Sequence, residues 1–290
     1  MHTTLAHLLS NGPVLTDGAW GTQLQARGLG IGEFPDLWNL THPEQVLQVA
    51  RAYVDAGSQI ILTNTFGANR IRMAEHTGAE RVEEINRRGV ELSRQAAQGR
   101  AAVFASIGPS GKLLLSGEVS EDELRDAFRQ QARALAEAGA DALVIETMTD
   151  LAEAKLALTA ARETSLPVVV CMVFDSGKAK DRTMMGNTPE QAAAALTAAG
   201  ADVVGANCGQ GIEGFATICG RLRAATDRSI WLKPNAGLPT IVEGRARYNV
   251  SPEGFAGAVP ELLRLGAGFV GGCCGTGPEF IASAARVLKR

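Results

Sequence analysis

A short pattern that occurs four times along the chain constrains its fold more than any other feature. In each copy an alanine-rich, helix-forming stretch ends in a turn of small residues with a glycine, and a short apolar segment follows. The copies lie at residues 55–63, 137–146, 198–205 and 265–271. Glycine adopts the left-handed conformation that ends a helix without a Cβ clash. Segments that are apolar on both faces are typical of parallel strands covered by helices.

Four more apolar segments bring the number of predicted strands to eight. They lie at residues 14–16, 102–107, 168–173 and 230–233, and helix-forming segments separate them. Eight strand–helix repeats in 290 residues indicate a (β/α)8 barrel. An open doubly wound sheet would also alternate, but no Gly-x-Gly-x-x-Gly motif follows the first strand. No linker interrupts the pattern, so we predict an α/β protein with one domain, a TIM barrel over residues 1–290.

Hydroxyl side chains mark four of the predicted helix starts. Each hydroxyl can accept a hydrogen bond from the first turn of its helix, and early acidic residues favour the same start. In three of the four, proline follows in the first turn, where its fixed φ suits a helix. The predicted capping residues are Thr41, Ser120, Thr188 and Ser251.

The composition limits the partners and the location that we expect. The net charge is −3 and no run of lysine and arginine occurs, which argues against nucleic acid binding. The N-terminus lacks a signal peptide, and no apolar run is long enough to cross a bilayer, so we expect no membrane association. The five cysteines lack the spacing of a disulfide framework, which indicates a reducing cytoplasm.

Polar residues gather at the predicted carboxyl ends of the strands, where barrels of this type form their active sites. They follow the first, second, fourth, sixth, seventh and eighth strands. Since strands six and eight are near neighbours around a closed barrel, residues far apart in sequence come to one rim. The candidate site residues are Asp17, Gly18, Thr63, Asn64, Glu146, Asn207, Cys208, Cys273 and Cys274.

Three of the five cysteines form a candidate metal site. Cys273 and Cys274 lie between glycines in the sequence Gly-Gly-Cys-Cys-Gly-Thr, and Cys208 lies in Gly-Ala-Asn-Cys-Gly. Three thiolates suit a soft divalent metal, for which zinc is the first candidate, and three protein ligands leave a fourth position open, as in catalytic sites. Cys171 lies inside an apolar predicted strand and Cys219 inside a predicted helix, and we interpret both as core residues.

Other interpretations of the three cysteines have less support. A disulfide between adjacent cysteines is strained and rare. A structural zinc site would need a fourth protein ligand. The four histidines all lie in the N-terminal part of the chain, without the spacing of ligands.

The two carboxylates at strand ends, Asp17 and Glu146, allow two interpretations. Acidic residues at strand–helix junctions often only cap a helix or bind the backbone. Two carboxylates that open onto a metal-bearing rim instead indicate the capture of a substrate ammonium group. We expect Asn64, Asn207 and Asn235 to hold loop backbones in part, through side-chain hydrogen bonds.

Six motifs, taken together, resemble the homocysteine S-methyltransferase family. The resemblance covers essentially the whole chain in order. It implies a (β/α)8 barrel with zinc held by Cys208, Cys273 and Cys274, whose open position takes the thiolate of homocysteine. The motifs are Asp-Gly-Ala-Trp-Gly-Thr at 17–22, Thr-Asn-Thr-Phe-Gly-Ala-Asn at 63–69, Glu-Thr at 146–147, Gly-Ala-Asn-Cys-Gly at 205–209, Pro-Asn-Ala-Gly at 234–237 and Gly-Gly-Cys-Cys-Gly-Thr at 271–276.

The resemblance also implies the substrate contacts and the reaction. The amino group of homocysteine would meet Asp17 and Glu146. Its carboxylate would lie near the backbone at Gly18 and the end of the second strand, with Thr63, Asn64 and Asn207 completing the binding residues. The zinc-bound thiolate would attack an activated methyl group and give methionine.

The methyl donor is the open question. Residues 63–67 look most like the homocysteine module of cobalamin-dependent methionine synthase, and the chain ends after the eighth helix, so a separate corrinoid protein is the expected donor. S-methylmethionine or betaine is the alternative. A betaine pocket would need aromatic rings, of which the rim has few beyond Trp20 and Phe66. The charged segment 175–183 is either a lid or docking loop, or a solvated loop, and the solvated loop is the favoured interpretation.

Two further functions stay open at this stage. The acceptor could be another thiol, within a demethylation pathway. Alternatively, the chain could be a non-catalytic subunit that binds zinc and a small amino acid in a corrinoid-dependent complex.

Overall fold

Eight parallel strands form one sheet in the computed structural model, which describes residues 2–76, 78–242 and 245–289. Their order is β1-β10-β7-β6-β5-β4-β3-β2, and a parallel bridge between Thr16 and Ile60 joins the two outer strands. The sheet therefore closes into the predicted (β/α)8 barrel. The strands are β1 (Val14–Leu15), β2 (Ile60–Ile61), β3 (Ala102–Ile107), β4 (Ala142–Met148), β5 (Val168–Met172), β6 (Val203–Gly211), β7 (Ser229–Asn235) and β10 (Ala267–Val270).

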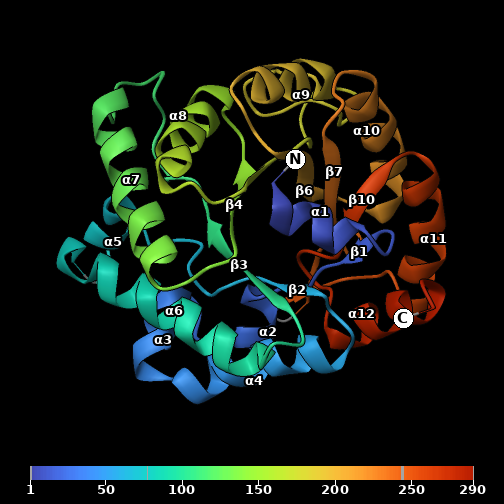
Figure 1. Ribbon diagram of the computed structural model, residues 1–290, viewed down its shortest axis with the longest axis horizontal. Helices are drawn as coiled ribbons and strands as arrows, with labels where there is room; N and C mark the ends of the chain where they lie inside the picture. Colours follow the sequence, from blue (N-terminus) through green and yellow to red (C-terminus); the bar gives the residue numbers. More distant parts are fainter. Residues whose placement is uncertain (1, 77, 243–244, 290) are drawn as a thin grey trace.

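Helices surround the barrel (Figure 1). An antiparallel hairpin of β8 (Thr240–Val242) and β9 (Arg245–Arg247) follows β7. Three short 3-10 helices cover Pro35–Leu37, Ala79–Arg81 and Arg162–Thr164. The α-helices are α1 (Thr3–Leu9), α2 (Gly21–Gln25), α3 (Trp38–Thr41), α4 (Pro43–Asp55), α5 (Arg70–Ala74), α6 (Val82–Ala97), α7 (Glu121–Glu137), α8 (Leu151–Ala161), α9 (Pro189–Ala198), α10 (Ile212–Ala224), α11 (Pro252–Arg264) and α12 (Pro278–Val287).

The glycines of the fourfold pattern all adopt the predicted left-handed conformation. Gly57, Gly139, Gly200 and Gly266 have φ values of 103°, 91°, 94° and 102°. A side chain at these positions would strain the backbone. Each glycine thus ends one helix and directs the chain into the next strand of the barrel.

Three of the four predicted helix caps are confirmed, and Thr41 is wrong. Ser120 and Thr188 form capping boxes with Glu123 and Gln191, and Ser251 accepts a hydrogen bond from the backbone of its helix. Thr41 is instead the last residue of α3, and His42 precedes α4 without a side-chain cap. The reason is that α3 continues up to this junction, so Thr41 is itself helical and its hydroxyl donates to Leu37 O at 3.3 Å.

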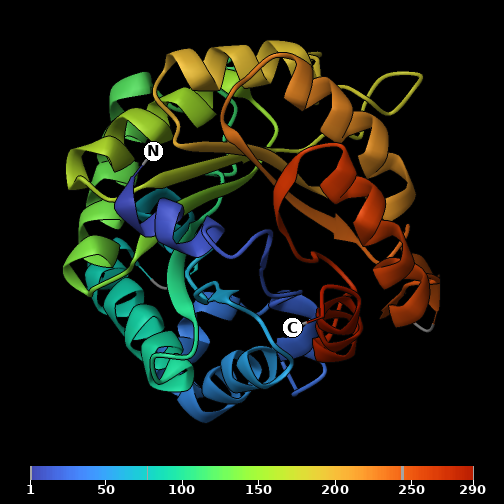
Figure 2. The ribbon, with the colours of Figure 1, turned by 45° about the vertical axis from the view of Figure 1, so that its right-hand side comes forward.

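The barrel interior is filled by large side chains and is covered at its amino end by α1. The rings of Phe104 and Trp231 stack at 5.9 Å, and that of Phe269 lies 5.2 Å from Trp231. Leu5 of α1 belongs to the same buried cluster, and α1 crosses the end of the barrel in both ribbon views (Figures 1 and 2). Cys171 is buried in this cluster and Cys219 in the layer between helices and sheet, as core residues.

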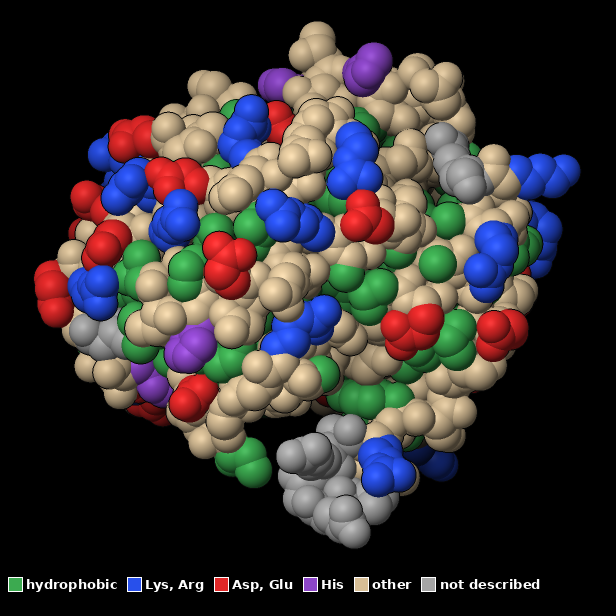
Figure 3. Space-filling view, turned by 90° about the horizontal axis from the view of Figure 1, so that it is seen from below, with side chains coloured by type: hydrophobic (Ala, Val, Ile, Leu, Met, Phe, Trp, Pro, Cys, Tyr) green, Lys and Arg blue, Asp and Glu red, His purple; other side chains and the backbone are tan. Residues whose placement is uncertain are grey.

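The surface carries both signs of charge. On the face that Figure 3 shows, Lys and Arg side chains are interspersed with Asp and Glu. Within the described residues, no helix is both long and apolar enough to span a bilayer.

Candidate active site and metal centre

A cavity of about 410 Å³ opens at the carboxyl ends of the strands. Seven of the nine candidate residues line it. Asp17 and Asn207 lie behind its wall, where each has a hydrogen bond to a lining residue, Trp20 and Thr147 respectively. The lining candidates are Gly18, Thr63, Asn64, Glu146, Cys208, Cys273 and Cys274.

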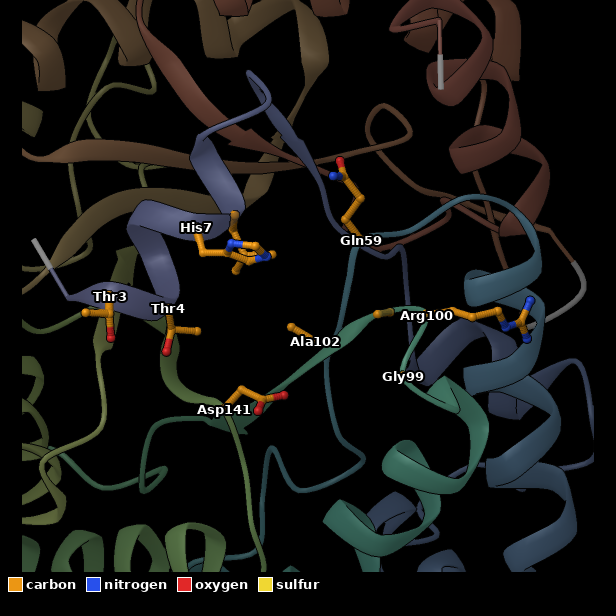
Figure 4. A pocket seen from close by; sticks show the side chains of 10 residues that line it. Thr3, Thr4, His7, Gln59, Gly99, Arg100, Ala102 and Asp141 are labelled. Atoms are coloured by element: carbon orange, nitrogen blue, oxygen red, sulfur yellow. The ribbon is translucent and has the colours of Figure 1, made fainter.

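A larger hollow, of about 630 Å³, lies at the opposite end of the barrel (Figure 4). Thr3, Thr4 and His7 of α1 line it, and Figure 4 shows the Arg100 side chain directed away from α1. Arg100 pairs with Asp55 at 2.8 Å. No candidate residue lines this hollow, and its charged groups do not converge, so we assign the site to the smaller cavity.

The three predicted metal ligands converge at the cavity. Cys208 Sγ lies 3.2 Å from Cys273 Sγ and 3.6 Å from Cys274 Sγ, and the three sulfurs all lie within 4.8 Å of one another. These separations exclude disulfides, whose S–S distance is about 2.05 Å. Three sulfurs bound tetrahedrally to one zinc through bonds of about 2.3 Å would lie about 3.8 Å apart. The donor set and its spacing therefore fit zinc.

An irregular backbone turns Cys208 toward the other two cysteines. The sequence predicts that β6 ends at this residue, whereas the strand continues to Gly211. Its pairing with β7 shifts between Asn207 and Gly211, and Cys208 has a φ of 60°. A positive φ is uncommon for a residue with a side chain, and it is typical of functional positions.

Glycines let Cys273 and Cys274 both face the cavity. The two residues are anchored through their amides, which donate to Pro234 O at 2.7 Å and Asn235 Oδ1 at 3.0 Å. Gly275 has a φ of 82°, and a Cβ atom there would lie 2.3 Å from the ring of Tyr248. The close packing of Tyr248 therefore requires glycine after the cysteine pair.

Tyr248 is a site residue that the sequence analysis missed. Hydrogen bonds from Cys208 and Cys273, and a weaker one from Tyr248, lower the pKa of Cys274 to about 3. Burial and the nearby cysteines raise the pKa of Tyr248, so its hydroxyl stays protonated and can donate. Its position after a hairpin rather than after a barrel strand gave no signal in the sequence.

Asp17 forms a buried ion pair with Lys233. Both side chains are nearly inaccessible to solvent, and Lys233 Nζ lies 2.5 Å from Asp17 Oδ1. The other carboxylate oxygen accepts from Leu62 N at 2.7 Å and Trp20 Nε1 at 2.8 Å. Burial alone would lower the pKa of Lys233, but Asp17 and Glu146 outweigh it, so the lysine stays charged. The sequence analysis missed Lys233, although a lysine inside an apolar strand is a signal.

Glu146 is the candidate carboxylate that faces the cavity. It accepts from Ser106 Oγ at 2.5 Å, and Asn207 Nδ2 lies 3.5 Å from its other oxygen. Burial raises the pKa of Glu146 to about 7, although the charge of Lys233 opposes this shift. Asn207 also binds the amide and hydroxyl of Thr147, each at 2.7 Å. Asn207 thus orients Glu146 and its loop.

The remaining candidates shape the cavity wall. A Cβ atom at Gly18 would lie 2.4 Å from Thr276 O, so only glycine fits there. Thr63 Oγ1 binds Thr65 Oγ1 at 2.6 Å and accepts from Ser106 N at 3.1 Å. Asn64 donates to Pro35 O at 2.8 Å. As expected, Asn64, Asn207 and Asn235 hold loop backbones, but their role toward a ligand is a proposal.

The sequence profile of the homocysteine S-methyltransferase family matches residues 14–288, and the chain belongs to this family. It is 30% identical to the methionine synthase of Mycobacterium tuberculosis over 310 residues and 29% identical to that of Mycobacterium leprae over 307. Each alignment covers 99% of this chain, which spans only about a quarter of those relatives, 26% and 25%.

Solved structures support the fold. The homocysteine methyltransferase MmuM from Escherichia coli, in a metallated form, is 24% identical, with a TM-score of 0.81 over 98% of this chain and 99% of that one. Its oxidized form is 23% identical, with a TM-score of 0.80 over 97% and 99%. At this identity the likeness shows the fold alone.

Proposed function

We propose that the protein transfers a methyl group to the thiol of homocysteine and forms methionine, with zinc held by Cys208, Cys273 and Cys274. The observation that carries this proposal is the convergence of three sulfurs within 4.8 Å at a cavity that Glu146 also lines. Membership of the homocysteine S-methyltransferase family supports the acceptor. The unpaired state of all five cysteines fits the reducing cytoplasm that we expect.

Zinc, when bound, supplies a positive charge that keeps a coordinated thiol deprotonated and nucleophilic. In the proposed reaction the substrate thiolate attacks the methyl carbon of the donor. A sulfur–carbon bond forms, and the bond between methyl and donor breaks, with its electron pair leaving on the donor. The protein contributes orientation, because it holds both ends of the acceptor beside the donor.

Glu146 is our proposed partner for the ammonium group of homocysteine. It lines the cavity, and its carboxylate has acceptor capacity beyond the bonds from Ser106 and Asn207. Asp17 already accepts three hydrogen bonds and is fully buried. We therefore propose that Asp17 acts on the substrate mainly through Lys233 and Trp20, which line the cavity. The backbone at Gly18, Thr63 and Asn64 remains our proposed neighbour of the substrate carboxylate.

A methylcorrinoid protein is our proposed donor. The mouth of the barrel carries large exposed hydrophobic side chains on loops that follow β1, β3, β5 and β7. Exposed apolar residues that gather around a site are typical of surfaces that a protein partner covers. The residues are Ile31, Leu113, Leu115, Met184, Met185 and Leu238.

A small sulfonium or betaine donor is the second candidate. Phe34 lines the cavity beside Trp20 and Phe66, so the cavity has more aromatic surface than the sequence predicts. Aromatic faces attract quaternary ammonium and sulfonium groups.

The segment 175–183, considered above as a lid, folds back on itself at Ser176 and Arg182, and its Asp181 pairs with Arg221. It contributes no residue to the cavity lining.

A donor screen on a sample of measured zinc content tests the proposal. The purified chain is incubated with homocysteine and, in turn, a methylcorrinoid protein, S-methylmethionine and betaine, and methionine is quantified. We expect methionine with the corrinoid protein. Turnover with a small donor would favour the second candidate. No methionine with any donor, from zinc-loaded protein, would instead indicate another thiol acceptor or a non-catalytic subunit.

A further inference from the structure

Arg72 is a half-buried cation that lines the active-site cavity, and no acidic side chain among the described residues forms an ion pair with it. It lies on α5, near the loop that follows β3, where its Nη1 is 3.3 Å from the Cβ position of Gly111. Its Nε is buried without an acceptor. Among the described residues, no hydrogen bond or ion pair forms to its guanidinium group. Buried donors in native proteins rarely stay unpaired, so this Nε is a donor available to a ligand in the cavity.

The acidic residues around Arg72 do not neutralise it by contact. Asp36, also in the cavity wall, uses its carboxylate to accept from Gly67 N at 2.8 Å. Burial raises the pKa of Asp36 to about 7 in spite of the nearby Arg72 charge, so Asp36 carries only part of a negative charge at neutral pH. Glu75, the other acid close to Arg72, pairs with Lys112.

The other charged groups of the cavity make Arg72 the available site for an anion. Lys233, the second cation among the lining residues, is occupied by Asp17 at 2.5 Å. Glu146 and the three cysteines would repel an anion when ionised. A carboxylate that enters the cavity therefore meets one cation without an ion pair, and a guanidinium group binds carboxylates through two parallel hydrogen bonds.

We propose that Arg72 binds the carboxylate of a ligand in this cavity. The inference rests on the proposed methyl transfer, in which two ligands carry this group: homocysteine itself, and a small donor such as betaine or S-methylmethionine. In either case the cavity has a sulfur end at the three cysteines, an ammonium-binding carboxylate at Glu146 and a carboxylate-binding cation at α5.

Calorimetric binding to zinc-loaded protein tests this inference without relying on turnover. The variants are Arg72→Met, Arg72→Lys, which keeps the charge, and Arg70→Met, which removes a charge from the same helix outside the cavity. The ligands are homocysteine, S-methylmethionine and betaine, together with 3-aminopropane-1-thiol, which is homocysteine without its carboxylate.

We expect Arg72→Met to weaken one carboxylate ligand by about tenfold to a hundredfold, the range for a hydrogen bond to a charged group. Arg72→Lys should recover part of this loss, and Arg70→Met should bind as wild type. If Arg72→Met binds homocysteine more weakly and 3-aminopropane-1-thiol with unchanged affinity, the carboxylate belongs to the acceptor. If the affinity for homocysteine is unchanged and the affinity for S-methylmethionine or betaine falls, the carboxylate belongs to the donor.

The inference is overturned if Arg72→Met binds every ligand as wild type does. It is also overturned if the affinity for 3-aminopropane-1-thiol falls as much as the affinity for homocysteine, because the effect would then not depend on a carboxylate. Wild-type protein that forms methionine while Arg72→Met binds normally would leave the proposed function standing without this inference. Wild-type protein that binds none of the ligands would overturn both.

Discussion

At the residue scale, the cysteine cluster joins positions that lie far apart in the chain. Cys208 and Cys273 are 65 residues apart, yet their sulfurs lie 3.2 Å from each other. The cluster sits in strand-end segments above a barrel interior that other residues fill. We therefore expect the candidate metal site and the stability of the fold to be separable by mutation.

We expect Cys273→Ala to lose bound zinc and thiol methylation while the barrel still folds. Two sulfurs would remain, and structural or catalytic zinc sites use three or four protein ligands. Elemental analysis of the purified variant and circular dichroism measure the two effects. Cys219→Ala is the matched control, because this cysteine is a buried core residue whose thiol donates to the carbonyl groups of Leu262 and Leu265. Full zinc content in Cys273→Ala would show that the ligand assignment is wrong.

Glu146 should make homocysteine binding depend on pH near neutrality. Its pKa is raised to about 7, and only the ionised carboxylate pairs with an ammonium group. In wild type we expect the affinity for homocysteine to fall as the pH decreases from 8 to 6, and in Glu146→Gln we expect this pH dependence to be absent. At pH 8 the affinity of Glu146→Gln for homocysteine should be lower than that of wild type by a factor of about ten or more. A titration of the dissociation constant against pH measures this. An identical pH profile in the two proteins would exclude Glu146 as the ammonium partner.

The same group has a predicted effect on stability. A carboxyl group whose folded pKa is raised, here from 4.5 to about 7, contributes stability below pH 4.5 that is lost as the pH rises through 7. As the pH rises from 5 to 8, the free energy of unfolding of Glu146→Gln relative to that of wild type should therefore increase by up to about 3 kcal/mol. Denaturant unfolding at both pH values measures the gain. Asp36 has a similar raised pKa, but it is present in both proteins and cancels in the difference.

At the element scale, the helix starts follow local rules except where two helices meet. Ser120 caps α7 in both directions with Glu123, through hydrogen bonds of 3.2 and 2.9 Å. Thr41 has the same sequence context for a cap but lies at the end of α3. A hydroxyl residue followed by an acidic residue therefore predicted the N-caps of α7, α9 and α11 correctly. It failed for α4, because Thr41 is the last residue of the preceding helix.

We expect Ser120→Ala to destabilise the protein by about 1 kcal/mol, the usual loss for a capping side chain. Thr41→Ala should cost less, since its exposed hydroxyl caps no helix. Chemical denaturation of both variants makes the comparison. Equal losses would mean that the hydroxyl of Ser120 has no capping role of its own.

At the scale of the whole molecule, one end of the barrel carries the candidate site and α1 lies across the other. Helix α1 and Leu5 cover the amino end, whereas the carboxyl end has the cavity and the exposed hydrophobic loops. The hydrophobic loops lie at the end of the barrel where the cavity with the cysteines opens, so a bulky methyl donor that approached this cavity would meet them.

Charged substitutions on these loops should interfere with a protein donor. Leu115 and Leu238 are 83% and 65% exposed, so Leu115→Glu and Leu238→Glu should fold normally and bind homocysteine as wild type. We expect their methyl transfer from a corrinoid protein to fall about tenfold at low donor concentration. Val287→Glu on α12 is the control, because this exposed residue lies outside the strand–helix loops. Unchanged rates would contradict docking at this surface.

The barrel, its glycine turns and the cluster of three cysteines could be predicted from the chain, because they depend on patterns among near neighbours and on the rule that parallel strands end on one rim. The tertiary structure was needed to show which polar groups meet. It pairs Asp17 with Lys233, 216 residues away, packs Tyr248 against Gly275 and leaves Arg72 in the cavity wall without an ion pair to any residue that the structure describes. Such contacts depend on the closure of the barrel, which brings together side chains that no local pattern connects.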